Sequence, residues 1–185
     1  MAATSSEPNM SAADASSGLV TRLGLRFGLG AGLACALWMV GLHLTGSNAF
    51  GPKQILAQLL VPLVVVASEW ELRRRLKPGK PGLGRSLGVG GLTVLVAALV
   101  SAGSLLGLAY GAGEPALARN RAEVMEIVRA QQRENSKVKH SAQETTQQMQ
   151  NVANLSVKDL VLSNFTVVLL FGLVLGLPGG IFFRE

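Results

Sequence analysis

The chain has 185 residues, the size of a single domain. Its charged fraction is 15%, below the roughly 25% of an ordinary soluble domain, and 49% of its residues are hydrophobic. This composition excludes a water-soluble surface and indicates an all-α membrane protein. The formal net charge is +6, but the basic residues gather in one short segment between two apolar stretches, which argues against nucleic-acid binding.

Residues 1–21 are rich in alanine, serine and small polar residues and show no hydrophobic period. Such a composition cannot bury enough apolar surface to offset the entropy lost on ordering, so we expect a disordered cytoplasmic tail. The segment is not a signal peptide, because Glu7 and Asp14 come first and the apolar stretch begins only after Arg26.

Four stretches contain no Lys, Arg, Asp or Glu, namely 27–51, 54–68, 86–113 and 160–183. A helix needs about 20 apolar residues to cross a bilayer, and only the second stretch is clearly shorter. Pro62 is expected to bend that helix, and Trp70 to lie at its membrane interface. The sequence therefore predicts one membrane domain, residues 22–185, with spans at about 25–45, 54–71, 87–111 and 160–183.

The distribution of Lys and Arg predicts the orientation of the spans. Between the first two spans lies a single basic residue, Lys53, whereas six basic residues lie between the second and the third. Because basic loops stay in the cytoplasm, we expect both termini there and residues 112–159 outside. The six residues are Arg73, Arg74, Arg75, Lys77, Lys80 and Arg85.

The expected external segment contains signals for helix. Pro115 is a favoured first residue, and Leu117, Val124 and Val128 then follow at helical spacing, which predicts a helix to about Arg133. Its apolar face could pack on the bundle or on a partner, or the segment could stay disordered. Residues 156–159 resemble a helix cap at the start of the last span.

Glycines recur at a spacing of four in three of the expected spans. Because lipid gives helices no hydrophobic drive to associate, such stripes matter by letting two backbones approach closely. We expect them to pack within the bundle or between copies of the chain. The residues are Gly24, Gly28 and Gly32, then Gly103, Gly107 and Gly111, then Gly172, Gly176 and Gly180.

No set of residues predicts catalytic, cofactor or metal chemistry. His43, Glu69 and Glu71 fall near span ends, where an interfacial role is the favoured interpretation, and Cys35 is expected to be a buried inert thiol. Residues 79–86 approach a phosphate-binding loop but lack its lysine and its strand and helix context, so nucleotide binding is not expected.

Three features together resemble an uncharacterised bacterial membrane family, domain of unknown function 4199, over roughly residues 22–184. They are the glycine-rich opening of residues 23–32, the Glu-Trp-Glu-Leu-Arg motif of residues 69–73, and the insertion after Tyr110. The resemblance implies four spans with a long charged helical insertion before the last one. The family's usual ending is only loosely met by residues 177–180, and the resemblance implies no established activity.

These observations favour a non-enzymatic protein of the bacterial inner membrane. We expect its surroundings to be the lipid bilayer and its partner to be a second copy or another membrane protein. The alternative is a small transporter or channel subunit.

Overall fold

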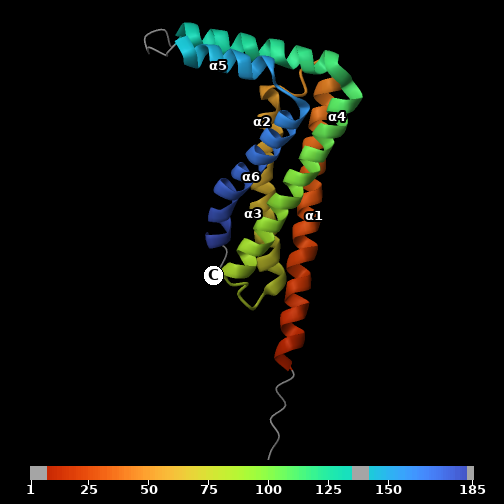
Figure 1. Cartoon of the computed structure of the whole chain (residues 1–185). Coiled ribbons are helices and arrows are strands. Elements are labelled where there is room, and N and C mark those ends of the chain that lie inside the picture. Colours follow the sequence, from red (N-terminus) through yellow and green to blue (C-terminus); the bar gives the residue numbers. More distant parts are fainter. Residues whose placement is uncertain (1–7, 135–141, 183–185) are drawn as a thin grey trace, which may run out of the picture.

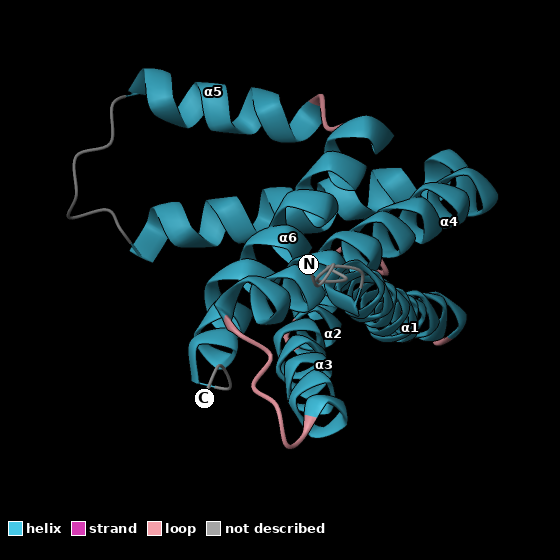
Figure 2. Ribbon diagram, turned by 90° about the horizontal axis from the view of Figure 1, so that it is seen from below, coloured by secondary structure: helices cyan, strands magenta, loops and turns pink. Residues whose placement is uncertain are grey.

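The computed structural model describes residues 8–134 and 142–182, and these two ranges contain helices and no strand (Figures 1 and 2). The elements in chain order are α1 (Pro8–Leu44), the 3-10 turn η1 (Pro52–Gln54), α2 (Ile55–Gln58), α3 (Leu60–Leu76), α4 (Leu83–Glu134), α5 (Ala142–Ala153) and α6 (Val157–Phe182). Residues 1–7, 135–141 and 183–185, with the first part of the expected tail and the last residue of the expected fourth span, lie outside the described ranges.

Four helical segments are long and apolar enough to cross a membrane, at Ser17–Leu44, Pro52–Leu76, Leu83–Arg133 and Val157–Phe182. Many large apolar side chains on them face outward, among them Leu37, Leu63 and Val174. Such a surface suits lipid rather than water. The prediction of an all-helical chain with four candidate spans is confirmed.

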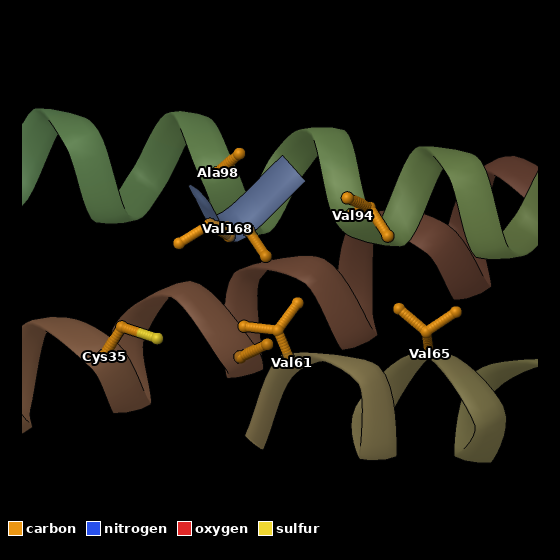
Figure 3. Packing of buried hydrophobic residues seen from close by; sticks show 8 residues of the cluster. Cys35, Val61, Val65, Val94, Ala98 and Val168 are labelled. Carbon is orange, nitrogen blue, oxygen red and sulfur yellow. The ribbon is translucent and has the colours of Figure 1, made fainter. Parts of the chain in front are cut away.

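The α4 helix is the centre of the bundle, because its contacts with α1 and α6 are the most extensive. The α3 helix also contacts α1, α4 and α6, whereas α1 and α6 do not pack side by side within the described residues. All four candidate spans contribute to the main apolar core. Figure 3 shows Cys35, Val61, Val65, Val94, Ala98 and Val168 meeting there.

The two ends of the bundle differ. The start of α1, the end of α6 and the connection from α3 to α4 lie at one end, which we call the basic end because residues 73–85 lie there (Figure 1). The last part of α4 and α5 lie across the opposite end. We call this opposite part, residues 114–134 and 142–153, the hairpin.

The second candidate span breaks before Pro62. The α2 helix ends at Gln58 and α3 begins at Leu60, with Leu59 between them. A proline ring clashes with the carbonyl of the residue four positions earlier, which for Pro62 is Gln58. The helix is therefore interrupted one turn before the proline, but Leu59 keeps helical dihedral angles of φ −67° and ψ −18°, so the expected bend stays a prediction.

The α4 helix bends sharply at Gly113, which has φ of +70° and ψ of −172°. A side chain would strain this left-handed conformation, and Pro115 then starts the next helical stretch. The helix expected from Pro115 to about Arg133 is present. The α5 helix had no counterpart in the sequence analysis, because most of its residues are polar and few apolar ones mark its face.

The start of α1 differs from the expectation of a disordered tail over residues 1–21, because the helix begins at Pro8. Residues 8–21 continue the first candidate span. Alanine favours helix, and adding residues to a formed helix avoids the unfavourable nucleation step. Composition alone therefore did not predict that the helix of the first span begins as early as Pro8.

Candidate functional site

The glycine stripe of α1 packs against α4. An ideal Cβ on Gly24 would lie 2.8 Å from Leu92, and one on Gly28 would lie 2.7 Å from the Cβ of Val96. Gly32 lies in the same way against Val100, where the distance would be 2.6 Å. These are closer than real side chains approach, so the two helices meet at a distance that only glycine permits.

The glycine stripe of α6 packs against α3 and α4. A Cβ on Gly172 would lie 2.6 Å from Val94 of α4, and one on Gly176 would lie 2.6 Å from Val65 of α3. Gly180 faces the carboxyl group of Glu69. Two of the three stripes are thus occupied inside the bundle.

The third stripe faces outward. Gly103, Gly107 and Gly111 are exposed, and a Cβ on any of them would meet nothing within 4 Å. We call these residues the outer glycine stripe. A groove of about 500 Å³ runs beside the stripe between α4 and α6, and Leu106 and Tyr110 line it.

The basic residues at the end of α3 are held by their neighbours. Arg75 donates a 2.8 Å hydrogen bond to Glu71, and the guanidinium carbon of Arg74 lies 5.7 Å from the centre of the Trp70 ring. Arg73 is half-buried, and Lys77, Lys80 and Arg85 are exposed. The six basic residues therefore share one end of the bundle, and three of them, Arg73, Arg74 and Lys77, line a surface pocket of about 380 Å³ with Trp70.

A buried polar network joins three helices in the half of the bundle nearer the hairpin. Gln58 of α2 donates a 3.0 Å hydrogen bond to Asn164 of α6, and Asn164 donates a 2.9 Å bond to Ser101 of α4. A pocket of about 370 Å³ reaches Gln58 and Asn164 from the surface. Because each amide finds a partner, the network stabilises the register of these helices.

A second polar cluster joins the bundle to the hairpin. The side-chain amide of Asn48 donates hydrogen bonds of 3.0 Å to Asn120 and 2.7 Å to Glu123. Arg121 donates to the carbonyl of Leu155, at 2.9 Å. The hairpin is therefore attached by polar contacts as well as by buried Leu117.

The other candidate residues of the sequence analysis, His43 and Cys35, lie outside these polar clusters. His43 is exposed and lines a pocket of about 300 Å³ with Asn48 and Arg119. Cys35 is buried and donates to the carbonyl of Ala57, at 3.5 Å. Within the described ranges, no group of three His, Cys, Asp or Glu side chains is placed to hold a metal ion.

Glu69 does not lie at the membrane interface as the sequence analysis expected, because its side chain is buried in the bundle. Its exposure is 0%, and neither carboxyl oxygen has a hydrogen-bond partner. The residue shares the inward face of α3 with Val65 and Leu72. Because Glu69 is close to the end of its span in the sequence, contact with water was expected. The helical period instead places Glu69 on the face of α3 that carries buried residues. This period was the sequence signal that could have predicted its burial.

Glycines of two other helices surround the Glu69 carboxyl. A Cβ on Gly90 of α4 would lie 2.5 Å from Oε1, and one on Gly180 of α6 would lie 2.9 Å from the same oxygen. A Cβ on Gly179 would lie 2.7 Å from Oε2. We call Glu69 with these three glycines the Glu69 site.

Comparison with known proteins gives a family but no activity. No curated protein and no solved structure matches the chain. The model of a family described as "Protein of unknown function (DUF4199)" matches residues 26–185, which includes all four candidate spans except the start of the first. The chain therefore belongs to the DUF4199 family, as its sequence resemblance implied.

Proposed function

We propose that this chain is a non-enzymatic integral membrane protein that assembles through the outer glycine stripe. The observation that carries the proposal is the open space over Gly103, Gly107 and Gly111, in contrast to the two filled stripes. Inside the bundle, glycine stripes occur where another helix approaches. The same sequence feature on the outside suits a helix from another chain.

A second copy of the chain is the favoured partner, with another membrane protein as the alternative. A glycine stripe can cross the same stripe of an identical helix, so that both chains use one surface. Leu106 and Tyr110, which are exposed beside the stripe, would then bury apolar surface against the second copy.

Energy transfer between labelled copies in lipid vesicles tests this proposal. We expect transfer between donor-labelled and acceptor-labelled chains to fall strongly in Gly107→Leu, because an isobutyl group would hold the backbones apart. Gly30→Leu is the matched control, since Gly30 is also exposed and has nothing within 4 Å of its Cβ position. Equal transfer in the two variants would contradict assembly through the outer glycine stripe.

The types of polar side chain buried in the bundle support the proposal that the protein is not an enzyme. Apart from Glu69, the buried polar side chains of the described residues are amides and hydroxyls. The best-connected of them, Gln58, Asn164 and Ser101, bond to one another. Such a set offers no base to activate a nucleophile, and Glu69 has no hydroxyl or thiol within hydrogen-bond distance to activate.

We also propose a bacterial inner (plasma) membrane location, with both termini in the cytoplasm and the hairpin outside. The support is the position of Arg73, Arg74 and Arg75 at the basic end, where the start of α1 and the end of α6 also lie. Basic residues near span ends favour the cytoplasmic side.

A second candidate function is transport, as a small transporter or a channel subunit. The observation that favours it is the buried carboxyl of Glu69, because an ionisable residue inside a membrane bundle is often part of an ion or proton pathway. Proton flux into vesicles containing the purified chain tests it. Flux that is lost in Glu69→Gln supports transport, and flux no greater than in empty vesicles contradicts it.

A further inference from the structure

We propose that Glu69 is an exchangeable proton-binding site between α3, α4 and α6. The reaction is a simple equilibrium, in which one carboxylate oxygen takes a proton from water at the basic end and later returns it. No other bond forms or breaks. This inference goes beyond assembly, because the Glu69 site and the outer glycine stripe have no residue in common.

The surroundings of the carboxyl favour the neutral acid. Both oxygens are buried and lack a hydrogen-bond partner. An ionised carboxylate without water or a donor is strongly disfavoured, and the usual response of a buried acid is to take up a proton. The side chains of Val66 and Leu87, which border Gly179 and Gly180 beside the carboxyl, are apolar.

The three glycines leave the space that the carboxyl of Glu69 occupies. A Cβ at Gly90, Gly179 or Gly180 would lie within 2.9 Å of a carboxyl oxygen, so the Glu69 side chain would have to leave its present position. These glycines come from two helices, so three helices meet around one acidic group. A packing role alone would be served by an apolar side chain, which needs no proton and no partner.

The charged groups on the packed helices do not supply a partner. At or near the basic end they are Asp14, Arg22 and Arg26 on α1, Glu71, Arg73, Arg74 and Arg75 on α3, and Arg85 on α4. The other charged residues of α4 belong to the hairpin, at the opposite end of the bundle. On α6 the charged residues within the described range are Lys158 and Asp159, at the opposite end from Gly180. None of these groups hydrogen-bonds to Glu69.

The route to water is short. Glu69 precedes Arg73 by one helical turn, about 6 Å along the axis at 1.5 Å per residue. Arg73 and its neighbour Trp70 line a surface pocket of about 380 Å³ at the basic end. A small movement of α3 or of the end of α6 would therefore connect the carboxyl to solvent.

Infrared difference spectra between the wild-type chain and Glu69→Gln in lipid vesicles test the proposal. We expect the wild type to show the C=O stretch of a protonated carboxylic acid at mildly acidic pH, and to lose it reversibly at alkaline pH. Glu71→Gln is the matched control, because Glu71 is already paired with Arg75. That variant should keep the band and its pH dependence.

Each other outcome contradicts the proposal. If the band is absent at every pH, the carboxyl is ionised and has a counterion. If the band is present and unchanged at every pH, Glu69 is a permanently protonated structural residue. If sodium or potassium ions remove the band at constant pH, the site binds a metal cation in place of a proton.

Labelling with dicyclohexylcarbodiimide gives an independent measurement. This apolar reagent adds to a protonated carboxyl and yields an N-acylurea, with no group leaving the protein. We expect the adduct on the Glu69 peptide by mass spectrometry, with the yield lost at alkaline pH. An adduct on Glu71 but none on Glu69, together with an absent infrared band, would overturn the proposal.

Discussion

Gln58 and Asn164 are 106 positions apart in the sequence, yet the side-chain amide of Gln58 donates a 3.0 Å hydrogen bond to the amide oxygen of Asn164. The bond joins α2 to α6 in the half of the bundle nearer the hairpin. The side-chain amide of Asn164 in turn donates a hydrogen bond to the hydroxyl of Ser101. The relationship explains why a span rich in leucine and valine retains an asparagine.

Asn164→Ala should destabilise the protein, because Gln58 and Ser101 would each lose a buried partner. We expect a loss of about 1–2 kcal/mol in the free energy of unfolding, within the range for buried hydrogen bonds in soluble and membrane proteins. Ser163→Ala is the control, since Ser163 is exposed. Detergent-induced unfolding in mixed micelles measures both variants. Equal stability of the two would show that the network contributes nothing.

Gly28→Ala should destabilise the contact between α1 and α4. The new Cβ would lie 2.7 Å from the Cβ of Val96 and 2.8 Å from the carbonyl oxygen of Thr93, so a helix must move. Overpacking of this kind costs about 1–3 kcal/mol.

Gly30→Ala is the matched control for that variant, because a Cβ there meets open space. Alanine favours helix by up to about 1 kcal/mol over glycine, so its stability should be unchanged or slightly higher. Thermal unfolding in the same detergent compares the two. The prediction is wrong if Gly28→Ala is as stable as Gly30→Ala.

Asn48→Ala should loosen the hairpin without unfolding the bundle. It removes the hydrogen bonds to Asn120 and Glu123 that attach the hairpin. Hydrogen exchange should then speed up in the amides around Val124 and stay slow around Val94. Asn151→Ala is the control, since Asn151 is an exposed residue of α5. Rapid exchange around Val124 in the wild-type chain would show that the hairpin is not attached at all.

The orientation can be tested with a reporter enzyme that is active only outside the cytoplasm. We expect activity when the reporter is inserted at Asn154, in the turn between α5 and α6. It should be inactive at Lys77 or after Glu185, because basic residues favour the cytoplasmic side. The reverse pattern would contradict the proposed orientation.

The sequence was sufficient for features that depend on local composition. Stretches without charge located the four candidate spans, and Pro115 located the start of the helical stretch that follows the bend in α4. The cap before α6 was also predictable. Ser156 and Asp159 bond reciprocally, with the Asp159 carboxylate accepting from the Ser156 amide at 2.9 Å and the Asp159 amide donating to the Ser156 hydroxyl at 3.3 Å.

Features that depend on which helices meet were not predictable. All three glycine stripes look alike in sequence, but only the structure shows that the stripe containing Gly107 is unoccupied while those containing Gly28 and Gly172 are filled. Glu69 and Glu71 are two positions apart, yet one is buried without a partner and the other pairs with Arg75. The helical period already separates their faces, since Glu69 shares a face with Val65 and Leu72, but only the structure shows that this face packs against α4 and α6.

Disulfide cross-linking in the membrane tests the proposed assembly most directly. Cys35 is the sole cysteine of the chain, so Cys35→Ala gives a background in which Leu106→Cys or Leu37→Cys supplies the one reactive thiol. Both positions are exposed, Leu106 beside the outer glycine stripe of α4 and Leu37 on α1. Assembly through the outer glycine stripe predicts that mild oxidation yields a covalent dimer of Leu106→Cys and little of Leu37→Cys. Equal yields from the two variants, or a dimer of Leu37→Cys alone, would contradict it.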